Sequence, residues 1–320
     1  MSLAFVFPGQ GSQSVGMLNA LAAHYPQIQA TYAEASATLG YDLWALVEKG
    51  PEETLNQTQK TQPAMLAAGV AVWRVWCAEG GALPSMMAGH SLGEYTALTC
   101  AGAIDFADAL NLVADRGRFM QEAVPAGRGA MAAILGLDDA QVTQVCIQAA
   151  EGDVLSPVNF NCPGQVVVAG TANAVARALD QAKAMGAKRA VLLPVSVPSH
   201  CALMQPAATR MAERLQKIKI TSPKIAILHN AEMRSESQPE AIMRALVRQI
   251  TAPVRWVEII EKMAATGVEK LIECGPGKVL TGLNKRIAKT TTTFAVYDQP
   301  SLAHALAHTQ IAAAATIPGI

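Results

Sequence analysis

Apolar and polar positions along the first part of the chain predict strands that lead through turns into helices. Leu3–Phe7 is a continuous apolar run that ends at a Pro-Gly-Gln-Gly turn, as expected of a short buried strand. The further elements predicted here are helical segments from Val15 to Gly81 with breaks at Gly40 and Gly50-Pro51, a strand at Pro84–Ala88, a helix from the Gly89–Gly93 turn through Cys100, and a helix capped by Asp105 that ends near Pro125-Ala126-Gly127.

The middle of the chain has a different pattern, with shorter elements and more strands. The predicted elements are a strand at Ala130–Gly136, a helix at Asp138–Glu151, strands at Val154–Phe160 and Gln165–Gly170 around an Asn161-Cys162-Pro163-Gly164 turn, a helix at Ala172–Gly186 and a strand at Lys188–Leu193. The order β-α-β-β-α-β is that of a ferredoxin-like unit. We therefore expect a small ferredoxin-like domain at residues 128–194, inserted into a larger domain.

Strands and helices alternate again after Pro194. The predicted elements are helices at Ala202–Lys217, Pro239–Thr251 and Pro253–Thr266, strands at Lys224–His229 and Glu269–Glu273, and a helix opened by Gly275-Pro276-Gly277. Alternation on both sides of the insertion predicts a mostly parallel sheet that is covered on both faces. The expected fold class is α/β, with a large domain made of residues 1–127 and 195–320. The last thirty residues are rich in Ala and Thr, and their pattern indicates little about structure.

The composition indicates a globular chain with a sizeable core and no strong electrostatic field. Of the 320 residues, 51% are hydrophobic and 16% are charged. Lys and Arg together number 25, as do Asp and Glu, so the formal net charge is zero. We therefore expect no binding to nucleic acid or to an anionic membrane through a long-range positive field. Local basic patches are compatible with this balance.

Segments that would direct the chain out of the cytoplasm are not predicted. The N-terminal residues lack the basic region, the long apolar region and the cleavage site of a signal peptide. The longest nearly apolar stretch, Pro63–Val72, is too short to span a bilayer. The six cysteines are scattered without a CxxC pair, which argues against a disulfide framework and a zinc knuckle. We expect a cytoplasmic protein without a bound metal.

The segment Gly89-His90-Ser91-Leu92-Gly93 fits the G-x-S-x-G pattern between a predicted strand and a predicted helix. A sharp turn in this context lifts the serine hydroxyl out of the sheet, and glycines are needed where side chains would clash. The Leu92 amide, at the start of the helix, would face a developing oxyanion. The motif predicts acyl transfer or hydrolysis through Ser91, without distinguishing the two.

A serine nucleophile requires a base, and the chain offers six histidines. His200 lies on the loop that leads back from the predicted insertion, a place where such bases are common. His90 is adjacent to Ser91 and would point elsewhere around the turn. His304 and His308 have the i,i+4 spacing of a metal pair, but no third ligand accompanies them, and an ordinary helix explains them.

Several segments together resemble one family, and they cover about Phe5 to Leu306. They are Pro8-Gly9-Gln10-Gly11-Ser12-Gln13, Gly89-His90-Ser91-Leu92-Gly93-Glu94, Val158-Asn159-Phe160-Asn161, Arg116, Pro198-Ser199-His200, Leu246-Val247-Arg248-Gln249 and Gly275-Pro276-Gly277. The chain thus resembles the malonyl-CoA:acyl carrier protein transacylases. The resemblance implies a hydrolase-like large domain with a ferredoxin-like insertion, and transfer of a malonyl group from malonyl-CoA to an acyl carrier protein in fatty acid biosynthesis.

The resemblance also assigns roles to residues of this sequence. Ser91 would be the nucleophile and His200 its base, oriented by the main-chain carbonyl of Gln249 instead of a carboxylate. The amides of Gln10 and Leu92 would form the oxyanion hole. Arg116 would hold the free carboxylate of malonate, a role that suits a planar guanidinium. No metal or redox cofactor is implied.

Asn159 and two basic pairs have weaker assignments. Asn159 would face the same cleft, with a turn-stabilising role as the alternative. Acyl carrier proteins are acidic, so Lys188-Arg189 and Lys285-Arg286 would form a docking surface for the carrier. The alternative for each pair is a solvated end of a helix or strand. A monomer is expected.

Three other functions remain open from the residues alone. A serine hydrolase or thioesterase would use a late histidine, here His304 or His308. A non-catalytic protein that binds carriers would form no acyl-serine. The same transfer chemistry could also serve a polyketide or a malonate-decarboxylating system.

Overall fold

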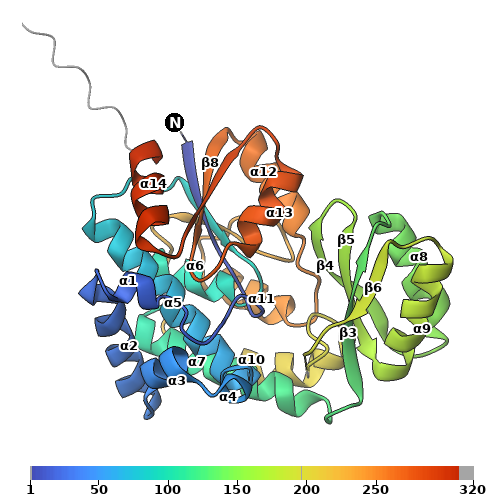
Figure 1. Ribbon diagram of the computed structural model, residues 1–320. Coiled ribbons are helices and arrows are strands. Elements are labelled where there is room, and N and C mark those ends of the chain that lie inside the picture. Colours follow the sequence, from blue (N-terminus) through green and yellow to red (C-terminus); the bar gives the residue numbers. More distant parts are fainter. Residues whose placement is uncertain (1, 196, 310–320) are drawn as a thin grey trace, which may run out of the picture.

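The larger of two sheets contains five parallel strands in the order β7-β2-β1-β8-β9 (Figure 1). The computed structural model describes residues 2–195 and 197–309. The strands of the large sheet are β1 Ser2–Phe7, β2 Met86–Gly89, β7 Ala226–Leu228, β8 Val268–Cys274 and β9 Thr292–Val296. Parallel strands end at the same edge of a sheet, so the segments that follow β1, β2 and β7 meet there.

Helices cover both faces of the large sheet. They are α1 Asn19–Ala22, α2 Pro26–Leu39, α3 Leu43–Lys49, α4 Glu52–Leu55, α5 Thr58–Ala78, α6 Gly93–Cys100, α7 Phe106–Ala123, the 3-10 helix η1 Ala202–Met204, α10 Gln205–Leu215, α11 Pro239–Gln249, α12 Trp256–Ala265, α13 Val279–Ile287 and α14 Gln299–Thr309. Phe5 and Phe7 of β1 pack with α2, α5 and α7, whereas Ala4 and Val6 pack with α12 and α13. Because both faces are covered, β1 is a continuous apolar run.

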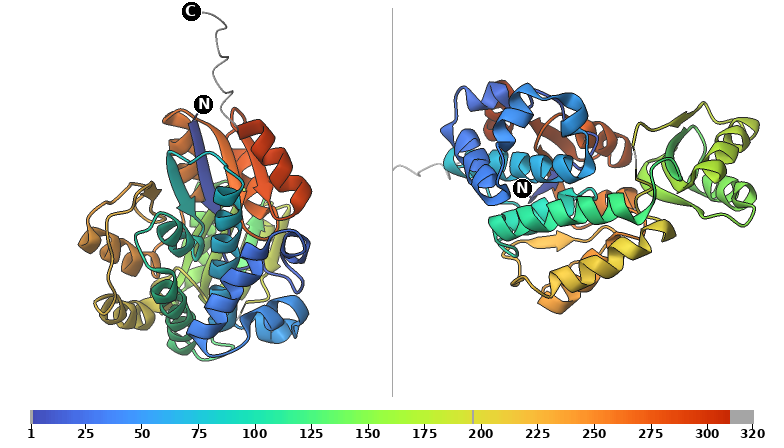
Figure 2. Two further views of the ribbon diagram at one scale, coloured as in Figure 1. Left: turned by 90° about the vertical axis from the view of Figure 1, so that its left-hand side faces the viewer. Right: turned by 90° about the horizontal axis from the view of Figure 1, so that it is seen from below.

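The smaller sheet is antiparallel, with the order β4-β5-β3-β6. Its elements are β3 Gly129–Leu135, α8 Asp139–Ala150, β4 Leu155–Cys162, β5 Gln165–Thr171, α9 Ala172–Ala184 and β6 Arg189–Leu192. The helices α8 and α9 pack on one face through Ile134 and Val168, and the other face holds Met131 and Val167. Seen from below, this unit lies to one side of the large sheet (Figure 2).

The predicted fold class is confirmed: a parallel sheet with helices on both faces accompanies a small ferredoxin-like sheet. The division into domains at residues 128 and 194 stays a prediction, and residues 310–320 of the predicted large domain lie outside the described residues. None of the helices among the described residues is long and apolar enough to cross a membrane.

One part of the element prediction was wrong, and one segment had been left without a prediction. Pro253–Thr266 was predicted as one helix, but α12 begins at Trp256 because Val254 is extended and exchanges backbone hydrogen bonds with Val158 and Phe160 of β4. The last thirty residues, whose pattern indicated little, supply the edge strand β9 and the helix α14, and α14 carries His304 and His308 as an ordinary helix would.

Candidate active site

Ser91 lies in a sharp turn between β2 and α6 and has a φ of 52°, in the left-handed region that non-glycine residues rarely adopt. The two glycines of the motif have no room for a side chain. A Cβ on Gly89 would lie 1.8 Å from the carbonyl carbon of Gly93, and one on Gly93 would lie 2.1 Å from the Phe7 carbonyl oxygen. Glycine is therefore required at both positions for the backbone to pack this closely around the serine.

His200 and Ser91 form a direct hydrogen bond, with 2.7 Å between Nε2 and Oγ. The other ring nitrogen, Nδ1, lies 2.7 Å from the main-chain oxygen of Gln249. Because a carbonyl oxygen can only accept, Nδ1 carries the proton and Nε2 is left free to accept one. The histidine is thus in the tautomer that a base for Ser91 requires.

Burial of the His200 ring, helped by the positive charge of Arg116, lowers the pKa of His200 to about 3. The hydrogen bond to Gln249 opposes this shift without cancelling it. The ring is therefore neutral at physiological pH.

Arg116 extends from α7 into the same site and is 1% exposed. Its Nη2 donates to Ser91 Oγ at 3.2 Å and to Gln249 Oε1 at 2.9 Å, and its Nη1 donates to Gln62 Oε1 at 2.8 Å. Among the described residues no ion pair includes Arg116. A buried cation held only by neutral groups next to Ser91 is suited to bind an anionic substrate.

A cleft between the large sheet and the small sheet opens onto Ser91, with a cavity volume of about 230 Å³. Gln10 and Leu92 line it, and neither main-chain amide donates a hydrogen bond to another described residue. Unpaired N–H groups beside a nucleophile can stabilise an oxyanion. The apolar part of the lining is Met120, Met131, Val167, Leu193, Val195, Val197, Val279, Leu280 and Leu283.

Residues 4–307 match the family model described as acyl transferase domain. The curated malonyl CoA-acyl carrier protein transacylase of Escherichia coli (strain K12) is 61% identical over 303 residues, which are 95% of this chain and 98% of that protein. The chain belongs to the malonyl-CoA–acyl carrier protein transacylase family. The predicted resemblance and the prediction of an acyltransferase are therefore confirmed.

Solved structures of the transacylase family have the same fold. An acyl carrier protein S-malonyltransferase from Vibrio cholerae is 58% identical, with a TM-score of 0.93 over 95% of this chain and 99% of that chain. A structure described as PlMCAT:AntF (holo), a type II PKS acyl-carrier protein in complex with its malonyl-transacylase, is 56% identical, with a TM-score of 0.95 over 96% of this chain and 100% of that chain.

The other residues predicted for the site differ in whether they line the cleft that contains Ser91. Asn159 is 6% exposed and lines the cleft. His90 points away from the serine, with its Nε2 2.9 Å from Asn161 Oδ1 of the small sheet. His304 and His308 lie on α14, stack against Phe294 and do not line the cleft. The base of a late-histidine hydrolase is therefore not near Ser91.

The two predicted basic pairs lie at one end of the small sheet. Lys188 and Arg189 are exposed at the start of β6, and Lys285 is exposed on α13. Arg286 donates to Pro163 O and to Gln165 Oε1 in the β4–β5 turn. Leu135 of β3 pairs with Gln165 on one side and with Arg189 on the other. Both basic pairs therefore lie at the same end of the small sheet.

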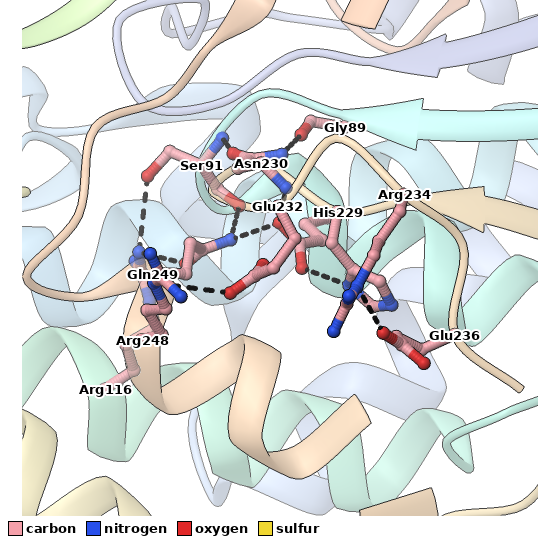
Figure 3. Close-up of polar contacts among 11 residues, drawn as sticks. Gly89, Ser91, Arg116, His229, Asn230, Glu232, Arg234, Glu236, Arg248 and Gln249 are labelled. Atoms are coloured by element: carbon pink, nitrogen blue, oxygen red, sulfur yellow. Dashed lines mark hydrogen bonds and ion pairs between the residues drawn. The ribbon is translucent and has the colours of Figure 1, made fainter. Parts of the chain in front are cut away.

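The sequence did not indicate which residues support the turn around Ser91 from behind. Asn230, two residues after β7, accepts from the Ser91 amide at 2.7 Å and donates to the Gly89 carbonyl at 2.6 Å (Figure 3). The Ser91 amide is therefore not available to an oxyanion. Gln62 of α5 was missed too. The described residues contain no group of three or more His, Cys, Asp or Glu that could hold a metal ion.

Proposed function

We propose that this chain transfers the malonyl group of malonyl-CoA to the phosphopantetheine thiol of an acyl carrier protein, through a malonyl ester of Ser91. The observation that carries the proposal is the contact of Ser91 with both a neutral histidine base and a buried arginine. The histidine base makes the Ser91 hydroxyl a nucleophile by accepting its proton. The buried arginine gives selectivity for an acyl group that ends in a carboxylate.

In the first step, His200 Nε2 accepts the Ser91 proton while Oγ attacks the thioester carbonyl. The oxyanion is stabilised by the amides of Gln10 and Leu92. The carbon–sulfur bond then breaks, and the coenzyme A sulfur takes the proton from His200. This leaves a malonyl ester on Ser91 and a neutral histidine.

In the second step, the carrier thiol gives its proton to His200 and its sulfur attacks the ester. The Ser91 oxygen leaves and regains the proton, so the enzyme returns to its starting state. Arg116 turns its guanidinium to the malonyl carboxylate in both steps. Asn159, on the cleft wall, contacts the bound acyl group in this scheme.

Fatty acid biosynthesis is the pathway that we assign to this transfer, as expected from the sequence. Polyketide synthesis is the second candidate, because one similar transacylase is described in complex with a type II PKS acyl-carrier protein. Our proposed docking surface for the acidic carrier is the basic end of the small sheet, formed by Lys188, Arg189, Lys285 and Arg286. The cytoplasmic location and the monomeric state stay predictions.

The intact mass of the protein after mixing with malonyl-CoA tests the proposed ester. The wild type should gain one malonyl group, and Ser91→Ala should gain none while keeping its thermal midpoint. Ser12→Ala removes another serine of the cleft and should still be labelled. A Ser91→Ala protein that gains the malonyl mass would refute Ser91 as the nucleophile.

A further inference from the structure

Glu94 is a fully buried carboxylate one turn of α6 beyond the nucleophile. Three N–H groups donate to its oxygens: His229 Nδ1 at 2.7 Å, the Asn230 amide at 3.0 Å and Gln249 Nε2 at 2.8 Å. All three are donors, as expected of a carboxylate that only accepts. The mechanism above does not use this residue.

The Gln249 side chain connects Glu94 to Ser91 and Arg116. Figure 3 shows Gln249 beside Ser91 and Arg116. Its Nε2 donates to the Ser91 carbonyl at 2.9 Å as well as to Glu94, and its Oε1 accepts from Arg116. Its main-chain oxygen accepts from His200. One residue thus contacts the nucleophile, the base and the arginine, and the carboxylate determines which end of its amide faces the arginine.

A carboxylate is needed here because an amide group can rotate by half a turn. If the Gln249 amide were reversed, its NH₂ would face the Arg116 guanidinium and two donors would oppose each other. A charged acceptor holds the NH₂ end more strongly than a neutral one. The amide therefore lies between an anion and a cation, with its donor end toward the first and its acceptor end toward the second.

His229 completes the environment of the carboxylate on its other side. Burial disfavours charge on this ring, but the hydrogen bond and the charge of Glu94 outweigh burial and raise the pKa of His229 above its usual value. The second ring nitrogen is buried and has no hydrogen-bond partner within the part of the chain that the structure describes. His229 therefore serves Glu94 and contacts none of the reacting groups.

We propose that Glu94 is a positioning residue for malonyl transfer. It fixes the orientation of the Gln249 amide, which in turn holds Arg116 and Ser91 in a fixed position relative to each other. The inference rests on the proposed function. It assigns no contact between Glu94 and the substrate. Its effect should pass through Gln249, which makes it separable from a role in stability alone.

Glu94→Gln tests this role, because it keeps the size and one acceptor oxygen while it removes the charge. The rate of malonyl-enzyme formation should be measured by rapid quenching and intact mass, well below the thermal midpoint of each variant. We expect Glu94→Gln to be about tenfold slower than the wild type, since charge-assisted hydrogen bonds are about twice as strong as neutral ones. A rate within twofold of the wild type would overturn the proposal.

A double-mutant cycle identifies the path of the effect. Gln249→Ala removes the amide and keeps the main-chain oxygen that orients His200. If Glu94 acts through this amide, the double variant should be no slower than Gln249→Ala alone. Rates that fall by the product of the two single effects would overturn the proposal, since Glu94 would then act elsewhere, for example through Asn230.

Glu232→Gln is the matched control. Glu232 is a largely buried carboxylate near the same loop that pairs with Arg248 at 3.5 Å (Figure 3). It feels the charge of Glu94, but no hydrogen bond or ion pair among the described residues joins it to Gln249 or Ser91. Its acylation rate should stay within twofold of the wild type. A wild type that forms no malonyl-enzyme would refute the proposed function itself, and this outcome is distinct from equal rates in wild type and Glu94→Gln.

Discussion

The pKa of His200 has a direct consequence for the pH range in which Ser91 can react. Burial and the charge of Arg116 lower this pKa to about 3, so the ring stays neutral and able to accept a proton as the pH falls past 6.5. The acid limb of acylation should therefore lie well below the range of an ordinary histidine.

We predict that kcat/KM for acetyl-CoA, which has no carboxylate of its own to titrate, stays constant from pH 8 to about pH 5. In Arg116→Ala the repulsion is lost, the pKa of His200 rises, and the acid limb should move to higher pH. Stopped-flow pH-jump measurements would check both profiles. A wild-type limb with a midpoint near 6.5 would contradict the assignment of a depressed histidine.

Arg116 should determine the preference for malonyl over acetyl groups. Arg116→Ala should lower kcat/KM for malonyl-CoA by about 100-fold, because charge-assisted hydrogen bonds to the carboxylate are lost, and change that for acetyl-CoA much less. Arg116→Lys should restore only part of the preference, since a point charge does not reproduce the planar fork. The measured quantity is the ratio of the two specificity constants.

Arg118→Ala is the control for this ratio. Arg118 lies on the same helix but is 45% exposed and pairs with Asp115 and Glu122. Its removal should leave the ratio as in the wild type. If Arg116→Ala also leaves the ratio unchanged, Arg116 is only a structural helix residue.

Residues within local motifs could be found from the sequence, whereas their supports could not. Ser91 lies in a G-x-S-x-G motif between a strand and a helix that the sequence predicts, and His200 lies on a loop that connects two predicted elements. Asn230 looks like an ordinary turn residue after a strand. Asn230 contacts the β2–α6 turn because β7 pairs with β2 in the folded sheet. Hydrophobic periodicity does not reveal which strands pair. Gln62 likewise reaches the site only through the packing of α5 on α7.

At the level of elements, the turn between β2 and α6 depends on backbone contact at Gly93. Gly93→Ala would place a Cβ 2.1 Å from the Phe7 carbonyl oxygen, where neither partner is a flexible side chain. We expect a loss of about 1–3 kcal/mol in the free energy of unfolding. Acylation should fall at least tenfold because the serine is displaced. Urea unfolding and mass labelling measure the two effects.

Gly282→Ala is a matched glycine substitution with the opposite expectation. Gly282 lies in α13, and a Cβ there meets no atom within 4 Å. Alanine should stabilise the helix by about 0.5–1 kcal/mol without changing acylation. A Gly93→Ala protein as stable as the wild type would contradict the prediction and show that the β2–α6 turn can shift to accommodate a Cβ.

The type of an element could be predicted where one hydrophobic period, that of a strand or that of a helix, dominated the segment and where tertiary packing favoured the same type. The βαββαβ order was read correctly because each strand is short and bounded by turn residues. Val254 was assigned to a helix because its pairing partner, β4, is far away in sequence. The strand β9 was missed because its threonines obscure the alternation, although β-branched side chains suit a strand.

For the whole molecule, a net charge of zero makes the local position of basic residues decisive for carrier docking. Lys188→Glu and Lys285→Glu should each raise the KM for the carrier protein several-fold, more strongly at low salt, because charge reversal opposes an acidic partner. The rate of malonyl-enzyme formation from malonyl-CoA should not change. Steady-state transfer at varied carrier concentration and rapid-quench labelling separate the two steps.

Lys49→Glu provides the matched charge reversal. Lys49 is an exposed lysine at the end of α3. The helix α3 lies on the side of the molecule away from the small sheet (Figure 1). Lys49→Glu should leave the carrier KM as in the wild type. Equal effects of all three reversals would indicate only a change in overall charge, and the proposed docking surface would then be wrong.

The partners of Ser91 have a consequence for the chain while it is being synthesised. Those that orient or deprotonate the serine lie 109, 139 and 158 positions later, at His200, Asn230 and Gln249. A nascent chain that has emerged only as far as the β2–α6 turn therefore carries Ser91 without its proposed base, without Asn230 behind the turn and without the Gln249 carbonyl that orients the base. Such contacts of high sequence separation form late in folding. We therefore expect the unfinished polypeptide to be unreactive toward cellular thioesters until its C-terminal half is in place.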